Sequence, residues 1–201
     1  YECYGIEGMR ALDATVDYIR TKYPEIFLIA DAKRGDIGNT AKMYAKAFFE
    51  EMDFDAVTIA PYMGADSVTP FLEYKDKWAI VLALTSNASA YQFQNAQKDG
   101  KPLYQAVMEE MMEISTPDNM MFVVGATKAD KLEELRSFCP DNFFLVPGVG
   151  AQGGSAEEVI AHGANDHGGL LINSSRGILF ADSSEDFAYY AGKVAARTAN
   201  L

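Results

Sequence analysis

The chain has 201 residues, of which 49% are hydrophobic and 12% aromatic, and this suits one globular domain with a sizeable core. Its net charge of −12, without a cluster of Lys and Arg, argues against nucleic acid as a partner, although a small anionic substrate needs only a few local cations. No apolar run approaches the roughly 18 residues that span a bilayer, so we expect no membrane association. With only two cysteines and no C-x-x-C pattern, we expect a protein of the reducing cytoplasm.

Apolar, β-branched runs alternate along the chain with stretches of helical period. The runs are Ile26–Ala32, Ala56–Ala60, Trp78–Leu84, Met121–Ala126, Phe143–Val146 and Gly168–Asn173. Each is nearly continuous in apolar residues, which is typical of parallel strands buried on both faces. The helical stretches are Glu7–Lys22, Asn39–Glu51, Lys101–Ile114, Lys128–Phe138 and Ser155–His162.

This alternation predicts an α/β fold with a parallel sheet. Six strands fit an open doubly wound sheet, or a (β/α)8 TIM barrel, which usually needs about 250 residues. The opening Tyr1–Gly5 reads as the end of a strand and a turn before the first helix. We therefore expect a single TIM-barrel domain over residues 1–201, N-terminally incomplete, lacking strand 1 and most of strand 2.

The segment Ser86–Gly100 is polar and lies between a strand and a helix. A long polar loop at this place is often a lid or a binding loop, but a solvated surface loop has the same composition. Both interpretations stay open at this point.

Three charges, Asp31, Lys33 and Asp36, follow the apolar run Ile26–Ala30. Residues two apart on a strand point to the same side, so Asp31 and Lys33 are expected to project together at the C-terminal end of a strand, where barrel enzymes place their active sites. Two carboxylates would hold the ammonium protonated. Alternatively, the first two residues form a loop salt bridge and Asp36 caps the next helix.

Two later loops have the composition of a phosphate site. Pro147–Gly154 is rich in small residues, including Gly153, and lets backbone N–H groups approach an anion, with Gln152 in reach. Asn173–Gly177 carries Arg176, whose guanidinium matches phosphate oxygens. Ser174 and Ser175 lack a recognisable His partner for nucleophilic chemistry, so backbone positioning is expected of them. Alternatively, the glycines only form turns and Arg176 is a solvated surface charge.

The pattern D-x-K-R-x-D-I-x-x-T from Asp31 to Thr40 resembles the signature of orotidine 5'-phosphate decarboxylases at every fixed position. The surrounding sequence resembles the bacterial branch of that family with longer chains. Further blocks agree in the family's order, and they are Ala60–Gly64, Leu84–Asn87, Val146–Gly154 and Leu171–Gly177.

The resemblance implies decarboxylation of orotidine 5'-monophosphate (OMP) to UMP in de novo pyrimidine biosynthesis, without a cofactor. It implies Lys33 as the proton donor to C6 of the pyrimidine and Asp31 against the substrate carboxylate. It also implies a homodimer with shared sites. The remaining roles that it implies are Asp36 and Thr40 reaching into the partner's site, Ser86 contacting the pyrimidine, and Gln152, Gly153, Ser175 and Arg176 binding the phosphate.

The sequence departs from the family pattern at its start. Family members carry an Asp after the first strand and a Lys on the second, a few residues before the dipeptide that appears here as Tyr1-Glu2. Neither is present, so we expect these 201 residues to be part of a longer chain.

The cysteines and histidines are not expected in the site. Cys3 and Cys139 are too few for a disulfide framework, and we expect buried packing for each. His162 reads as a helix-end residue and His167 as a loop residue. No convergent metal-ligand cluster is recognisable.

Two rival functions remain. A Mg-dependent sugar-phosphate decarboxylase of the 3-keto-gulonate-phosphate type, from the same superfamily, also uses D-x-K-x-x-D, but Arg34, Ile37-x-x-Thr40 and the Gln152 loop favour the pyrimidine enzyme. A non-catalytic nucleotide-binding barrel is the other rival, and the intact Asp31 and Lys33 argue against it because binding alone does not require them.

Overall fold

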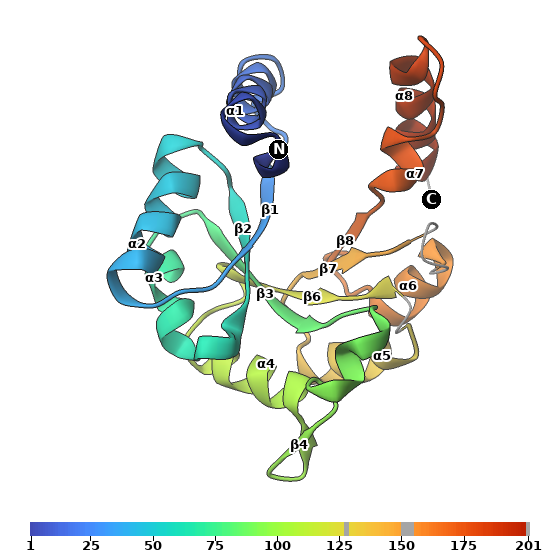
Figure 1. Cartoon of the computed structure of the whole chain (residues 1–201). Coiled ribbons are helices and arrows are strands. Elements are labelled where there is room, and N and C mark those ends of the chain that lie inside the picture. Colours follow the sequence, from blue (N-terminus) through green and yellow to red (C-terminus); the bar gives the residue numbers. More distant parts are fainter. Residues whose placement is uncertain (127–128, 150–154, 200–201) are drawn as a thin grey trace. The chain divides into compact units, whose positions relative to one another are not determined.

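The computed structural model describes residues 1–126, 129–149 and 155–199. The chain forms two compact units (Figure 1). The first comprises Tyr1–Val81 with Asp118–Met120, and the second comprises Leu82–Pro117 with Met121–Leu201. Each unit has its own helices and its own set of neighbouring strands.

The first unit contains three neighbouring strands in the order β1-β2-β3, and both pairings are parallel. Its elements are α1 (Gly5–Lys22), β1 (Ile29–Arg34), α2 (Gly38–Lys46), β2 (Ala56–Ile59), α3 (Thr69–Leu72) and β3 (Trp78–Leu84), whose end passes into the second unit. All four residues of β2 are buried, so the prediction of parallel strands covered on both faces is confirmed for it.

The second unit contains strands in the order β6-β7-β8, again with parallel pairings. Its elements are the hairpin β4 (Gln97–Lys98) and β5 (Lys101–Pro102), then α4 (Leu103–Glu113), β6 (Met120–Val124), α5 (Ala129–Phe138), β7 (Phe144–Pro147), α6 (Ala156–Gly163), β8 (Leu170–Asn173), α7 (Arg176–Leu179) and α8 (Phe187–Thr198). The first residue of β6, Met120, belongs to the first unit.

The predicted elements are present, with shifted boundaries. The first strand begins at Ile29 and not at Ile26, because the Asp55 carboxylate accepts the N–H of Leu28 at 2.7 Å and Arg20 donates to the carbonyl of Ile26 at 3.3 Å. The helix that follows it changes to a π-helical turn over Ala47–Glu51. Helices α3, α7 and α8 were not predicted.

The interpretation of Tyr1–Gly5 as a strand end is wrong. Glu2–Tyr4 form a 3-10 helix that leads directly into α1 at Gly5. The N–H of Tyr4 donates to the carbonyl of Tyr1 at 3.0 Å. A Cβ on Gly8 would lie 1.9 Å from that carbonyl oxygen, so the tight turn needs glycine there.

The polar segment Ser86–Gly100 is ordered by local structure. A 3-10 helix covers Ala88–Gln92, and Asp99 and Gly100 take φ values of 54° and 82° at the tip of the β4–β5 hairpin. Positive φ at both central residues is the geometry of a type I′ turn, for which Asp-Gly is a preferred sequence. Ion pairs from both hairpin strands to α4 hold it in place, beyond the end of that helix in Figure 1. The hairpin accounts for the polar composition, and the lid function stays a prediction.

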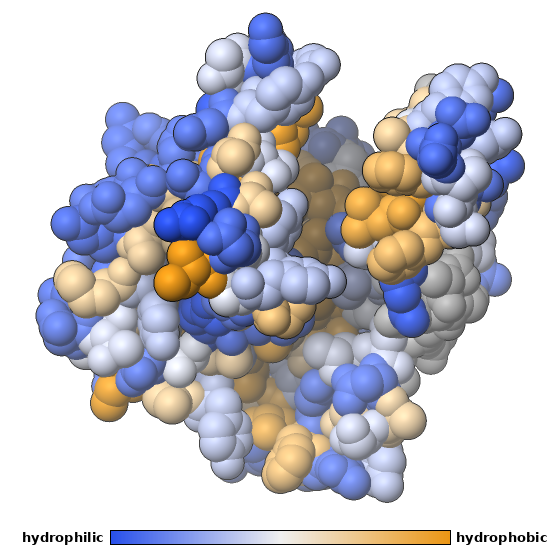
Figure 2. All heavy atoms as spheres, turned by 45° about the horizontal axis from the view of Figure 1, so that its top comes forward, coloured by the Kyte–Doolittle hydropathy of each residue, from blue (hydrophilic) through white to orange (hydrophobic). Residues whose placement is uncertain are grey.

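Hydrophobic side chains of α7 and α8 are open to solvent, as Figure 2 shows. They are Leu179, Phe180, Phe187, Tyr189 and Tyr190, each at least 43% exposed. Neither helix has a buried residue. Helix α7 has only four residues and gives no periodic pattern, whereas α8 has apolar residues at helical spacing, which the prediction missed.

A buried arginine organises the second unit. The guanidinium of Arg136 donates to five backbone carbonyls, and its plane lies over the Phe144 ring with the centroid 4.0 Å away. The accepting residues are Cys139, Pro140, Asn142, Gly163 and Gly169. Burial lowers the pKa of Arg136 from its ordinary value. One side chain therefore satisfies carbonyls that follow α5 and α6 and precede β7 and β8.

The two cysteines differ. Cys139 is fully buried, its thiol donates to the side-chain oxygen of Asn142 at 3.1 Å, and burial raises its pKa to about 11. Packing is thus confirmed as its role. The same prediction is wrong for Cys3, which is exposed, because the 3-10 helix that carries it has no buried residue.

We predict that Arg136→Met lowers the free energy of unfolding by about 3 kcal/mol or more, since several buried carbonyls lose their donor. Chemical denaturation measures the change. The matched control is Arg197→Met, at an exposed position of α8, which should stay within about 0.5 kcal/mol of the original chain. Equal effects of the two substitutions would contradict the structural role of Arg136.

Candidate active site

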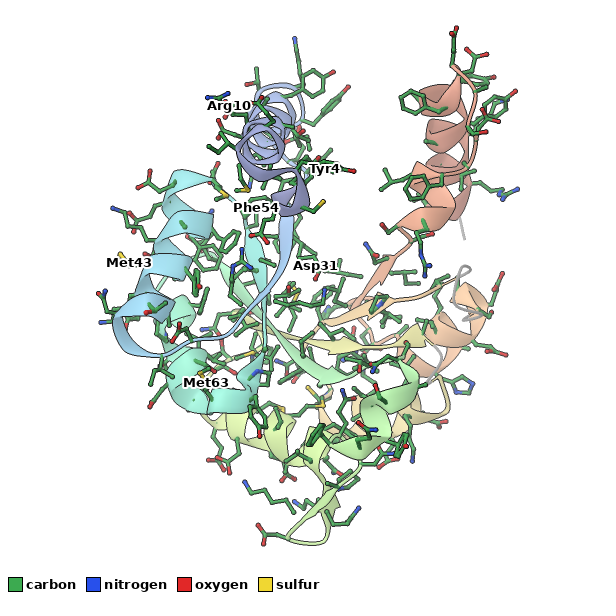
Figure 3. The ribbon with its side chains drawn as sticks, in the orientation of Figure 1. Tyr4, Arg10, Asp31, Met43, Phe54 and Met63 are labelled. Carbon is green, nitrogen blue, oxygen red and sulfur yellow. The ribbon has the colours of Figure 1, made fainter. Side chains whose placement is uncertain are left out.

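The side chains of Asp31 and Lys33 meet on β1, with Nζ of Lys33 2.5 Å from Oδ1 of Asp31. The predicted contact is confirmed, but the route to it is different. Ala30 pairs with Val57 and Arg34 pairs with Ile59, so four steps along β1 oppose two steps along β2. β1 therefore bulges between Ala30 and Arg34, and Figure 3 labels Asp31 at this place. Simple strand alternation does not apply inside the bulge.

Lys33 has a φ of 47°, in the left-handed region. This conformation costs a residue with a Cβ about 1–2 kcal/mol. Its ion pair offsets little of that cost, because Lys33 and Asp31 are 52% and 65% exposed and exposed pairs contribute about 0–1 kcal/mol. Stability does not explain this arrangement, and backbone strain of this kind is concentrated at functional sites.

The neighbouring Arg34 has a structural role. Its guanidinium carbon lies 5.5 Å from the centroid of the Tyr44 ring and 5.4 Å from that of Phe48, and it pairs with the carboxylate of Glu2. It also donates to the carbonyl of Ala32 at 3.1 Å. The arginine of the D-x-K-R-x-D pattern thus fastens the bulged segment to α2 and to the start of the chain.

Asp36 and Thr40 lie beyond the bulge. The half-buried Asp36 accepts the N–H of Ile37 at 2.8 Å, while Ile37 itself occupies the N-cap of α2, so Asp36 is not the helix cap. Thr40 is exposed on α2. Within the described part of the chain, the ion pair of Lys33 is with Asp31 and none joins it to Asp36.

Asp31 also borders a cavity of about 550 Å³ in the first unit. Apolar side chains of Met9, Phe48 and Phe54 contribute to its lining, and Lys33 does not. This cavity therefore does not by itself mark the binding place of a charged ligand.

In the second unit, Ser86 lies two residues beyond the end of β3. Its Oγ is buried and has no hydrogen-bond partner among the described residues. Gly125 packs against it, since its N–H donates to the carbonyl of Leu84 at 2.8 Å and a Cβ on Gly125 would lie 2.0 Å from the Ser86 Oγ. A buried hydroxyl without a partner is costly and needs an explanation, and a ligand is one.

The loops after β7 and β8 leave the sheet side by side. Pro147 pairs with Asn173 at the ends of these strands. Gly148 follows with a φ of 96°, and on the other loop Ser175 precedes α7 with Arg176 as its first residue. Arg176 is exposed and forms no ion pair within the described ranges. Gln152 and Gly153 lie outside the described residues.

The predicted site residues therefore fall into two groups. The first unit holds Asp31, Lys33, Asp36 and Thr40, and the second holds Ser86, Ser175 and Arg176. Sequence reasoning missed Thr58, whose buried hydroxyl contacts both Asp31 and Lys33, and it missed Gly125. Neither residue has a sequence signal, since one resembles a strand residue and the other a turn glycine.

The expectations for the two histidines agree with the structure. His162 lies near the end of α6, with Nδ1 3.5 Å from the Glu133 carboxylate, and His167 lies in a loop. Over the described ranges, no group of three or more His, Cys, Asp or Glu side chains is arranged to hold a metal ion. None of the helices in those ranges is long and apolar enough to cross a membrane.

The chain is a parallel α/β protein with a Lys–Asp pair at the end of one strand and, among the described residues, an arginine without an ion pair after another. These are features of the class of α/β enzymes that act on anionic substrates. The chain belongs to the orotidine 5'-phosphate decarboxylase / HUMPS family, whose sequence model matches residues 2–188. The resemblance inferred from the Asp31–Thr40 pattern is thereby confirmed.

Individual relatives support the same family membership. The chain is 55% identical over 192 residues to the orotidine 5'-phosphate decarboxylase of Christiangramia forsetii, covering 96% of this chain and 71% of the relative. It is 54% identical to that of Phocaeicola vulgatus, covering 97% and 72%. Among solved structures, the OMP decarboxylase of Leishmania donovani matches with a TM-score of 0.84 at 36% identity, covering 98% of this chain and 75% of that one.

We predict that Gly125→Ala lowers the free energy of unfolding by about 1–3 kcal/mol, because the new methyl group overlaps Ser86. In a Ser86→Ala background the cost should shrink without vanishing, since Oγ is gone but the Ser86 backbone nitrogen stays 2.8 Å from the added carbon. A double-mutant cycle measured by urea denaturation gives the coupling. Gly192→Ala in α8, where a Cβ meets nothing within 4 Å, is the control and should not destabilise the chain. Full additivity of the two substitutions would refute the contact.

Proposed function

We propose that the chain decarboxylates OMP to UMP, a step of de novo pyrimidine biosynthesis. The observation that carries the proposal is the Asp31–Lys33 pair, held on a bulged and locally strained strand end although it adds little to stability. The relatives at 50–55% identity that bear the name orotidine 5'-phosphate decarboxylase support the same substrate.

In the proposed reaction the bond between C6 and the carboxyl carbon breaks, CO₂ leaves, and the electron pair stays at C6. The ammonium of Lys33 stabilises this negative charge and then donates a proton to C6, which gives UMP and a neutral amine that water reprotonates. A preorganised charge beside a developing anion is an effective form of catalysis, and it needs no cofactor. Asp31 lies beside the departing carboxylate, where its charge raises the energy of the bound substrate.

The second unit binds the rest of the nucleotide in this proposal. Arg176 and Ser175 bind the phosphate together with Gln152 and Gly153, and this role is supported by Arg176 being exposed and without an ion pair to any residue that the structure describes. Ser86 contacts the pyrimidine, and its buried hydroxyl, which has no hydrogen-bond partner among the described residues, supports that contact. Binding energy from the phosphate then orients the ring at Lys33.

We further propose that the strands belong to one (β/α)8 barrel domain spanning residues 1–201. The parallel pairing within each unit and the alternation of strands and helices support it. A cytoplasmic location remains part of the same proposal.

The Mg-dependent sugar-phosphate decarboxylase remains the rival, because the family description joins orotidine 5'-phosphate decarboxylases with the HUMPS group. The two activities differ in their need for a metal. The identity to relatives named for OMP favours the pyrimidine substrate.

The test is conversion of OMP to UMP by the purified chain in the presence of EDTA. We expect turnover with the chelator present, and Lys33→Ala should lower kcat by at least about 10³-fold, because it removes both the stabilising charge and the proton donor. UMP binding, measured by calorimetry, should survive within about tenfold. The control is Lys75→Ala, a lysine 91% exposed in the same unit, which should keep full activity.

Two results would overturn the assignment. Unchanged turnover in Lys33→Ala would remove the lysine from the chemistry. Loss of activity in EDTA, restored by Mg²⁺, would favour the sugar-phosphate enzyme.

We also propose a homodimer in which Asp36 and Thr40 complete the partner's site. Lys33→Ala and Asp36→Ala should each be inactive alone. Refolded together in equal amounts, they form hybrid dimers with one intact site each, so about one quarter of the original activity should return. Size-exclusion chromatography confirms the dimer, and a mixture with no recovered activity would contradict shared sites.

A further inference from the structure

Thr58 lies on β2 directly beside the bulge of β1. Its side chain is fully buried, as are those of its neighbours Val57 and Ile59, and it is the polar residue of an otherwise apolar strand. Burying a hydroxyl is costly unless it is hydrogen-bonded. Its bonding partners therefore indicate what the hydroxyl does.

The hydroxyl of Thr58 accepts one hydrogen bond from the bulged strand. The backbone N–H of Lys33 donates to Oγ1 of Thr58 at 2.9 Å. Because β1 leaves its register between Ala30 and Arg34, this side chain gives the Lys33 amide an acceptor inside the bulge. It thereby holds the lysine backbone in the left-handed conformation at φ 47°.

The same hydroxyl donates its single hydrogen to one of two acceptors. Oδ1 of Asp31 lies 3.1 Å away and the carbonyl oxygen of Ala30 lies 3.5 Å away. The nearer and charged acceptor forms the stronger bond, so Thr58 donates to the carboxylate. That oxygen also accepts from Nζ of Lys33.

These bonds close a ring. It runs from the Lys33 amide to the Thr58 hydroxyl, on to the Asp31 carboxylate, and back through the Lys33 ammonium. Both charged groups are exposed, whereas the hydroxyl that joins them is buried in the sheet. Side chains in water would otherwise sample several rotamers, and the buried anchor limits them.

We propose that Thr58 is a positioning residue that sets the geometry of the Asp31–Lys33 pair for the decarboxylation. The inference rests on the proposed function, and it adds a residue of β2 that acts through both members of the pair. Thr58 does not touch the substrate.

The test compares Thr58→Val, which keeps the shape and removes the hydroxyl, with Thr58→Ser, which keeps the hydroxyl. We expect Thr58→Val to lower kcat for OMP by about 10–100-fold, because misplacing a reacting group by about 1 Å has an effect of that size. KM should change less than about threefold, since the phosphate and ring contacts are unaffected. Thr58→Ser should stay within about threefold of the original kcat.

A second measurement does not depend on activity. Hydrogen exchange of the Lys33 amide, followed by NMR, should be at least about tenfold faster in Thr58→Val and unchanged in Thr58→Ser, because the acceptor of that N–H is removed only in the first. The internal reference is the Ala60 amide, which donates to the carbonyl of Arg34 at 2.8 Å and should keep its protection in both.

The matched control for lost packing is Ile80→Val. Ile80 is fully buried and lies opposite Thr58 on β3. It should lower thermal stability without changing kcat. If Thr58→Val does not fold, Thr58→Ala takes its place, because it also lacks the hydroxyl and is expected to give the same loss.

Retained kcat in the variants without the hydroxyl, or an equal loss in Thr58→Ser, would overturn the proposal. So would unchanged exchange of the Lys33 amide. Absence of OMP turnover in the unsubstituted chain would instead refute the proposed function, and the exchange measurement would still decide whether Thr58 holds the pair.

Discussion

The site depends on the mismatch in length between β1 and β2. The residues of β2 are buried on both faces and pair regularly with β3, so that strand leaves little room for adjustment. β1 must place two additional residues between its pairings at Ala30 and Arg34. The excess chain is forced outward at this point, and the residues it carries there include Asp31 and Lys33. A regular strand of the same composition would present these side chains at a different spacing.

Arg34, Arg136 and Arg176 show two different uses of arginine. Arg34 and Arg136 bury their guanidinium groups against aromatic rings and donate to backbone carbonyls, which fastens one segment to another within each unit. Arg176 is exposed and makes no ion pair in the part of the chain that the structure describes. A guanidinium has five donors in a fixed plane, so it can either satisfy several carbonyls or bind an anion. Whether a given arginine satisfies carbonyls or binds an anion depends on the groups that the fold places around it.

Much of the fold could be predicted from the sequence, because continuous apolar runs such as Trp78–Leu84 indicate buried parallel strands directly. The contact of Asp31 with Lys33 could also be predicted, although for a reason that the bulge replaces. The bulge itself could not be predicted, because it arises from the register of β1 against β2. No residue type in β1 indicates a bulge. Thr58 was missed for the same reason. A threonine in a strand is common, and the role of its hydroxyl becomes visible only from the Lys33 amide and the Asp31 carboxylate that it contacts in the structure.

The error at the chain start has a physical origin. Tyr1–Gly5 has strand-like composition, but the backbone turn closed by Tyr4 and the space left by Gly8 favour a 3-10 helix. Helix α8 is a different case, because apolar residues recur at helical spacing over Phe187–Val194, so its sequence does contain the periodic signal of a helix. A strand-like composition therefore does not exclude a turn, and a periodic apolar pattern indicates a helix whether or not the fold buries its apolar residues.

The net charge of −12 is compatible with an anionic substrate on physical grounds. At physiological ionic strength, exposed charges more than about 8 Å apart are largely screened from one another. Most of the carboxylates therefore have little influence on a bound nucleotide, and the few groups in direct contact decide its affinity. Under the proposed function those groups are Arg176 and the loop N–H groups at the phosphate, with Lys33 at the ring. Asp31 is the exception under the same proposal, since its negative charge lies beside the lysine and acts there on the substrate carboxylate before CO₂ leaves.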